Sequence, residues 1–180
     1  MILKHPLALL LFISVTLSVT TLAGAATTVL APLWEVTGLK NPESVIYDAQ
    51  RDVLYVSNVD GNPPDQDGNG SIARVSAEGK MLEPEWIGGL NAPKGMALRG
   101  ATLYVADIDT LVEIDINKGR VTKKYPAAQA KFLNDVTIDR HGNVYVSDML
   151  GNAIYRLADG AFELWLKDDA LQFPNGLHAE

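Results

Sequence analysis

The sequence predicts an all-β fold made of repeated four-stranded antiparallel units, and two observations support that prediction. Four segments can be aligned on one another, and the same position in each is occupied by Glu43, Lys94, Asn134 and Asn175. We call these four positions the slots. They lie 51, 40 and 41 residues apart, and a repeat of about forty residues is typical of β-propeller blades. We therefore expect three blades and the first strand of a fourth.

The second observation is the strand pattern inside each unit. Every unit holds short runs rich in Val, Ile, Tyr and Trp, and turn residues separate them, which is the pattern of four antiparallel strands. A first strand starts at the slot. The later strands are expected at residues 54–58, 103–107 and 144–148, then 72–75, 111–114 and 154–157, then 86–87, 121–125 and 163–166. No stretch has the period of an amphipathic helix of ordinary length. The predicted blades are residues 40–90, 91–131 and 132–172, and residues 173–180 begin the next.

Residues 1–25 have the pattern of a signal peptide. Lys4 precedes an apolar stretch over residues 6–22, and Ala23-Gly24-Ala25 offers the small residues that a signal peptidase accepts. An uncleaved membrane anchor is the alternative, although five Ser and Thr residues interrupt the stretch. We expect export to the periplasm or the exterior, with residues 26–180 as the mature domain and no membrane association after cleavage.

Composition and charge limit the classes of partner. The chain is 47% hydrophobic and 21% charged, as in an ordinary globular protein. Its net charge is −7, and its only basic cluster is Lys123-Lys124. Nucleic acid is not an expected partner, because binding phosphates requires a larger basic surface. The absence of cysteine excludes disulfide bonds and thiol nucleophiles.

The blade count predicts that this chain is a fragment. Propeller rings close with roughly four to eight blades, and three are present here. Residues 28–39 read as a fourth strand without a blade of its own, because residues 36–39 resemble residues 87–90. Such a strand closes the ring by completing the last blade. We therefore expect a natural protein about twice as long, and assembly of the ring from several short chains is the alternative. The oligomeric state stays open.

Several phrases of the sequence resemble the gluconolactonase, regucalcin and luciferin-regenerating-enzyme family. The phrases are residues 42–45, 133–136, 139–148 and 173–177, and the resemblance covers nearly everything after residue 38. It implies a six-bladed propeller with one divalent cation in its central channel. It also implies that Glu43 and Asn175 are ligands of that metal, and that Asn134 faces the substrate or the outer shell of the metal. The remaining ligand, an Asp, would come from a blade beyond Glu180.

The residue types at the slots agree with that implication. Inner strands of propeller blades line one axis, so residues at equivalent positions converge. A carboxylate and two carboxamides suit a hard cation, with calcium favoured and magnesium open; zinc also stays open, although the chain offers no Cys and no His pair. Such a cation polarises a lactone or ester carbonyl. The alternative for Asn134 and Asn175 is that they hold the entry loops of their blades by bonding backbone groups.

Lys94 is the slot that does not fit a metal site, because an ammonium group cannot be a ligand. It could pair with Glu43, hold an anionic group of a substrate, or close the channel through a buried salt bridge in a relative without activity. The sequence leaves these alternatives open.

The resulting expectation is an exported, metal-dependent hydrolase of a small lactone or related ester, with Asn134 as the catalytic candidate and a small molecule as substrate. The chain has no nucleophile elbow and no P-loop, so serine-hydrolase and nucleotide-binding readings lack support. The first alternative is a non-catalytic propeller that binds a ligand or another protein. A further alternative is a propeller similar to strictosidine synthase or paraoxonase.

Overall fold

The computed structural model describes residues 31–180. The expected signal peptide and the start of the segment 28–39 lie outside the described residues. Residues 33–180 pack as one unit. No helix within residues 31–180 is long and apolar enough to cross a membrane.

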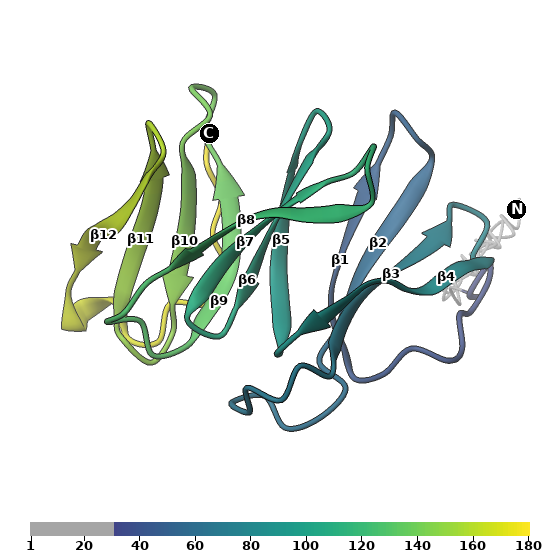
Figure 1. The fold of residues 1–180 in the computed structure, drawn as a ribbon, viewed down its shortest axis with the longest axis horizontal. Coiled ribbons are helices and arrows are strands. Elements are labelled where there is room, and N and C mark those ends of the chain that lie inside the picture. The colour runs from purple at the N-terminus through teal and green to yellow at the C-terminus, as the bar shows by residue number, and fades with distance from the viewer. Residues whose placement is uncertain (1–30) are drawn as a thin grey trace, which may run out of the picture. The chain divides into compact units, whose positions relative to one another are not determined.

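Twelve strands form three antiparallel sheets, each of four strands in chain order (Figure 1). The first sheet contains β1 (Pro42–Asp48), β2 (Val53–Asn58), β3 (Gly70–Ser76) and β4 (Met81–Leu90). The second contains β5 (Pro93–Arg99), β6 (Thr102–Asp107), β7 (Thr110–Asp115) and β8 (Arg120–Pro126). The third contains β9 (Leu133–Ile138), β10 (Val144–Asp148), β11 (Ala153–Ala158) and β12 (Ala161–Lys167). A single 3₁₀ turn, Asp169–Leu171, follows β12. The predicted all-β fold class is confirmed.

The core lies between neighbouring sheets, as the alternation of side chains along a strand requires. Val53 and Tyr55 on β2 belong to the same buried cluster as Leu103 and Val105 on β6, which joins the first sheet to the second. A separate cluster joins the second sheet to the third. Each sheet therefore stabilises its neighbour through apolar side chains on the facing surface.

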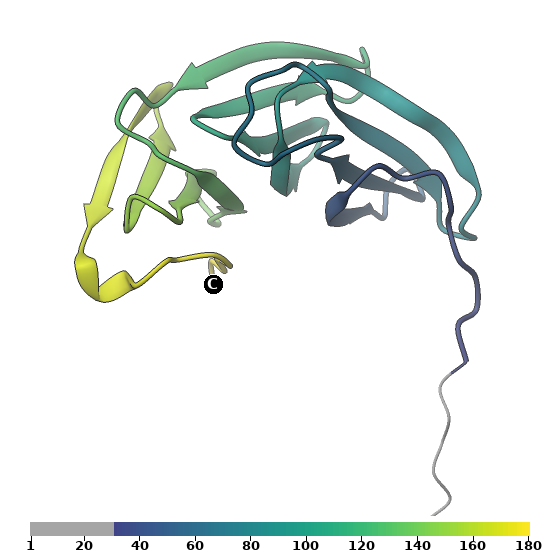
Figure 2. The same ribbon diagram turned by 90° about the horizontal axis from the view of Figure 1, so that it is seen from below.

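The sheets fan out around a shared inner side (Figure 2). β1 lies beside β5, and β5 lies beside β9, so the first strand of every sheet is the innermost one. After β12 the chain turns back, and its last residues run along β9. Residues 173–180 form no strand ladder of their own, although they occupy the place of the next inner strand.

The segment before β1 does not pair as a strand within the described residues. Residues 31–39 run without regular structure, and Val36 and Leu39 pack on Val56 and Val75 at the free face of the first sheet. Trp34 lies against Gly79, a positive-φ turn residue whose surroundings have no room for a side chain. The segment expected to close a ring thus covers part of the first sheet.

Candidate functional site

Three of the four slots, Glu43, Lys94 and Asn134, lie on β-bulges of the inner strands. In β1 the register passes from Pro42 opposite Asn58 to Ser44 opposite Ser57, which leaves Glu43 without a partner. The other two inner strands break register at the same place, with Lys94 and Gly95 bulged in β5 and Asn134 and Asp135 bulged in β9. A bulge re-aims the side chain that it carries, and bulges are common beside active sites. Three successive inner strands thus share one irregularity, placed at the residues that the repeat singles out.

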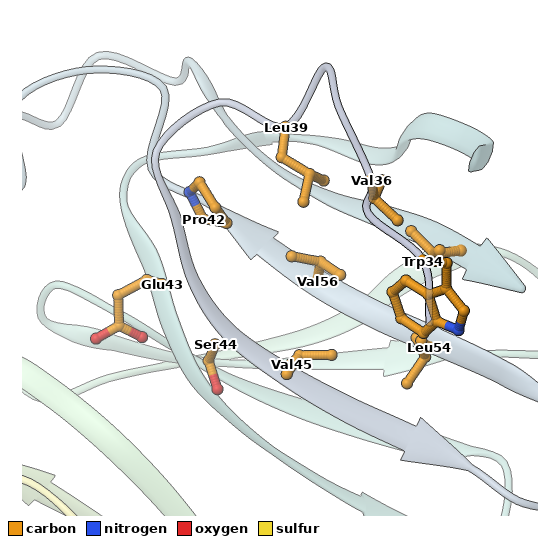
Figure 3. Close-up of a pocket in the computed structure, with 10 residues that line it drawn as sticks. Trp34, Val36, Leu39, Pro42, Glu43, Ser44, Val45, Leu54 and Val56 are labelled. Atoms are coloured by element: carbon orange, nitrogen blue, oxygen red, sulfur yellow. The ribbon is translucent and has the colours of Figure 1, made fainter. Parts of the chain in front are cut away.

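Glu43 carries a carboxylate with no hydrogen-bond or ion-pair partner among residues 31–180. Figure 3 shows it turned away from the apolar group that contains Trp34 and Val56. Partial burial raises the pKa of Glu43; the charge of Lys94 opposes that rise, and the charge of Asp135 adds to it. Glu43, Lys94 and Asp135, from three different sheets, are therefore close enough to influence one another.

Lys94 is only 2% exposed, and its ammonium group already has partners. Nζ donates a hydrogen bond of 2.8 Å to the carbonyl oxygen of Ala92 and lies 4.2 Å from the ring centroid of Phe132. Burial lowers the pKa of Lys94, and the nearby carboxylates of Asp107 and Glu43 oppose that shift. No ion pair between Lys94 and Glu43 is present in the described part of the chain. Of the roles left open by the sequence, direct pairing with Glu43 is not the one this structure adopts.

Asn134 is 5% exposed, and its carboxamide has no hydrogen-bond partner among the described residues. Its neighbour Asp135 accepts a 2.7 Å hydrogen bond from the backbone N–H of Leu177. The amide atoms of Asn134 are not among the fully buried side-chain atoms that lack a partner in the described segment, so solvent or a ligand can reach the carboxamide.

Asn175 is exposed and is held through its backbone. Its carbonyl oxygen accepts a 2.7 Å hydrogen bond from Ser147 Oγ, and its side chain bonds no residue of the described segment. No hydrogen bond or ion pair joins Asn175 to Glu43. The structure brings the Asn175 slot beside the Asn134 slot, one inner strand along the fan.

Other residues hold the entry loops, so the side chains of Glu43, Asn134 and Asn175 are not needed for that purpose. Asp107, at the end of β6, accepts hydrogen bonds from the backbone N–H groups of Asn91 (3.1 Å) and Ala92 (2.7 Å). Asp148 does the same in the third sheet, for Lys131 and Phe132. Asn58 accepts from the N–H of Lys40 in the first sheet. The polar residue that ends each second strand thus fixes the loop leading to each slot.

Asp135 and Ser147 are the residues that sequence reasoning missed. Both stand inside phrases that the sequence comparison used, but neither was assigned a role. Their position was the available signal. Asp135 directly follows a slot, and Ser147 directly precedes the polar residue that ends the second strand, at the position of Ser57 and Ala106 in the other sheets. What the sequence could not show is that Asp135 and Ser147 contact residues of the C-terminal segment.

The donor set is compatible with a hard cation but is incomplete as it stands. No group of three His, Cys, Asp or Glu side chains that could hold a metal lies within residues 31–180. At the slots, the oxygen donors without a protein partner among the described residues are the Glu43 carboxylate and the carboxamides of Asn134 and Asn175, a set of the kind that calcium and magnesium accept. The Lys94 ammonium, bonded to Ala92, is not a fourth member of that set.

Comparisons with known proteins establish the fold. No known family profile matches the chain, and no curated protein matches it. A chain of a crystal structure described as a nidogen/laminin complex is similar, with a TM-score of 0.55, 21% identity, and coverage of 67% of this chain and 44% of that chain. Hydrazine synthase from Kuenenia stuttgartiensis is similar with a TM-score of 0.53 and 23% identity, over 73% of this chain and 36% of that one.

Both similar structures are β-propeller proteins. The sheets of this chain are propeller blades. At these identities the similarity extends to the fold alone. The chain spans less than half of the length of either protein, so any activity of a complete propeller is a matter for proposal.

Proposed function

We propose that this chain belongs to an exported, divalent-metal-dependent hydrolase of a small lactone or related ester, similar to gluconolactonases. The observation that carries the proposal is the set of bulges on successive inner strands. They hold Glu43 and Asn134, whose polar groups have no partner within the described residues, on the inner side of a fan of blades. Oxygen donors that have no protein partner and lie on neighbouring inner strands are a candidate binding site.

The roles of the residues follow from their chemistry. Glu43 supplies a negative charge and Asn175 a neutral oxygen to the cation, while Asn134 orients the substrate carbonyl or bonds the outer shell of the metal. A bound cation would polarise that carbonyl and lower the pKa of an attacking water.

The N-terminal pattern supports the exported setting of this enzyme. A Lys followed by an apolar stretch and an Ala-Gly-Ala sequence is what a secretion signal requires. Calcium, the favoured metal, binds oxygen ligands and no thiols, and the chain contains no cysteine.

The direct test measures lactone opening by the natural protein at its full length. Activity on an aldonolactone should require a divalent cation and should fall at least about 100-fold in Glu43→Gln, which keeps the shape and removes the charge. Asp115→Asn, which alters a partly exposed carboxylate that pairs with Lys118 at the end of β7, is the control and should retain activity. Full activity in Glu43→Gln, or activity that survives chelation of all divalent cations, would reject the proposal.

A non-catalytic ligand-binding propeller is the second candidate, and Lys94 is the observation in its favour. The ammonium group of Lys94 is buried and close enough to shift the pKa of Glu43. Its positive charge disfavours the binding of a metal cation at that site. Under this alternative the full-length protein binds an anionic or polar ligand in a Lys94-dependent manner and opens no lactone.

A further inference from the structure

The last eight residues of the chain are attached to the third blade in an unusual way. They form no strand ladder, yet side chains of the third blade bond their backbone at regular intervals. Ser147 Oγ donates to the carbonyl oxygen of Asn175 at 2.7 Å, the N–H of Leu177 donates to Asp135 Oδ2 at 2.7 Å, and the N–H of Ala179 donates to Thr137 Oγ1 at 3.2 Å.

Asp135 and Ser147 are themselves connected. The N–H of Asp135 donates a 2.9 Å hydrogen bond to Ser147 Oγ, so this hydroxyl accepts from β9 and donates to Asn175. The fully buried Ser147 (0% exposed) has no freedom to bond elsewhere. The Asp135 carboxylate bonds the N–H two residues further along, and bonds to charged groups are the stronger kind. We call Asp135 and Ser147 the clamp.

The clamp is specific to the third blade. In the first blade, Ser57 occupies the position of Ser147, but its hydroxyl bonds only the backbone of Ser44 in its own sheet. In the second blade the position is Ala106, and Gly95 takes the place of Asp135. There the adjacent inner strand approaches directly, since a Cβ on Gly95 would lie 2.6 Å from Asp135 Cα and 2.7 Å from the carbonyl oxygen of Asn134.

We propose that Asp135 and Ser147 are positioning residues that hold Asn175 on the inner side of the fan, beside Asn134. The clamp grips only backbone atoms, the carbonyl oxygen of Asn175 and the N–H of Leu177, so the carboxamide stays free for a ligand. Its role as a support for a cation ligand rests on the proposed function. The attachment of residues 175–179 to the third blade does not depend on the proposed function, because it follows from the hydrogen bonds alone.

The test combines hydrogen exchange on the 180-residue chain with a calcium titration of the natural protein at its full length. Asp135→Ala and Ser147→Ala should raise the amide exchange rates of residues 175–179 by roughly 10- to 100-fold, the range expected for the loss of one hydrogen bond with a charged or buried partner. Asp135→Asn keeps an oxygen that accepts from Leu177 and should restore most of the protection. Ser57→Ala, the matched serine of the first blade, should leave this exchange unchanged.

Calcium affinity in the same variants separates the two proposals. We expect weaker calcium binding in Asp135→Ala and Ser147→Ala, by a factor similar to that of Asn175→Ala, and unchanged binding in Ser57→Ala. Unchanged exchange in both clamp variants would overturn the clamp. Faster exchange with wild-type calcium affinity would show that the clamp holds the chain without supporting a ligand, which also overturns the positioning role. If the wild-type protein binds no calcium, the proposed metal site is rejected. The hydrogen-exchange rates of the clamp variants then decide whether the clamp holds the C-terminal segment.

Discussion

The charges around Glu43 decide how a cation could bind at the inner side of the blades. Glu43 must be ionised to be a ligand, and partial burial together with Asp135 raises its pKa while Lys94 lowers it. Lys94 therefore has two opposite effects on a bound cation. It favours the ionised form of Glu43, and it repels the ion itself. The two effects can be separated by pH, because the first disappears once Glu43 is fully ionised.

Replacing Lys94 with Met should move the pH dependence of calcium binding. Without the ammonium charge the pKa of Glu43 rises further, so the pH at which binding is half-maximal should increase. Well above that pH, binding should be tighter than in the wild type, since repulsion of the ion is gone. Calorimetric titrations between pH 5 and 8 measure both effects, and Lys118→Met, at an exposed turn, is the control. An unchanged midpoint would mean that Lys94 and Glu43 do not share a site.

Asp139, in the third blade, makes the stability of the fold depend on pH in the acid range. Partial burial opposes ionisation, but hydrogen bonds from the Asn143 side chain (2.8 Å), the Asn143 N–H (2.9 Å) and the His141 N–H (2.9 Å) lower the pKa of Asp139 to about 2. A carboxyl whose folded-state pKa lies below its unfolded value of 3.8 stabilises the fold above that value and loses this contribution as the pH falls toward 2.

The Asp139→Asn variant should therefore lose less stability than the wild type between pH 4 and about 2. The amide keeps an acceptor for the turn N–H groups and has no charge to lose. Thermal denaturation from pH 5 to pH 2 measures the difference, with Asp159→Asn, an exposed turn residue, as the control. Parallel curves for Asp139→Asn and wild type would contradict the assignment.

At the scale of elements, the inner strands depend on how closely their bulges approach. Gly95 follows the Lys94 slot and Gly176 follows the Asn175 slot, so the two glycines are equivalent in the repeat. Only Gly95 faces backbone at a distance that forbids a side chain, while a Cβ on Gly176 would meet nothing nearer than Asp135 Oδ2 at 4.0 Å.

We expect Gly95→Ala to destabilise the protein by about 3 kcal/mol, at the upper end of the usual cost of overpacking, because backbone atoms cannot move aside. Gly176→Ala should range from no change to about 1 kcal/mol of stabilisation, since it makes ordinary contacts and restricts the unfolded chain. Urea denaturation of the two variants tests the comparison. Equal effects would indicate that β5 and β9 are less closely packed than described.

The positions of the strands could be predicted from the sequence, but the β-bulges within them could not. The Val- and Tyr-rich runs predicted β2, β6 and β10 because alternation and turn residues are local signals. The bulges at Glu43, Lys94 and Asn134 depend on which residue of the neighbouring strand is opposite, and a single strand does not carry that information. The clamp was missed for the same reason, because Asp135 and Leu177 are 42 residues apart and meet only once the blade has formed.

At the scale of the whole molecule, the outer face of the first blade differs from the interfaces between blades. Leu54 and Val56 on β2 occupy the positions of Leu103 and Val105 on β6, but no blade formed by residues 31–180 covers them. They line a cavity of about 400 Å³ together with Trp34 and Val45 (Figure 3). Val45 is 60% exposed, and exposed apolar surface of this kind favours association.

The 180-residue chain should therefore self-associate, and Val45→Lys should shift it toward the monomer without loss of stability. Sedimentation velocity over a range of concentrations measures the shift. Arg120→Lys, a conservative change at an exposed position on β8, is the control. A wild-type chain that is monomeric at every concentration would contradict the prediction.

The account as a whole depends on whether the slot residues share one ion. The most direct measurement is an anomalous difference map from crystals of the full-length natural protein grown with manganese, a scattering substitute for calcium or magnesium. We predict a single strong peak on the inner side of the blades, about 2.0–2.6 Å from oxygen atoms of Glu43 and Asn175. A map without a peak there, or with Glu43 and Asn175 too far apart to reach one ion, would contradict the account.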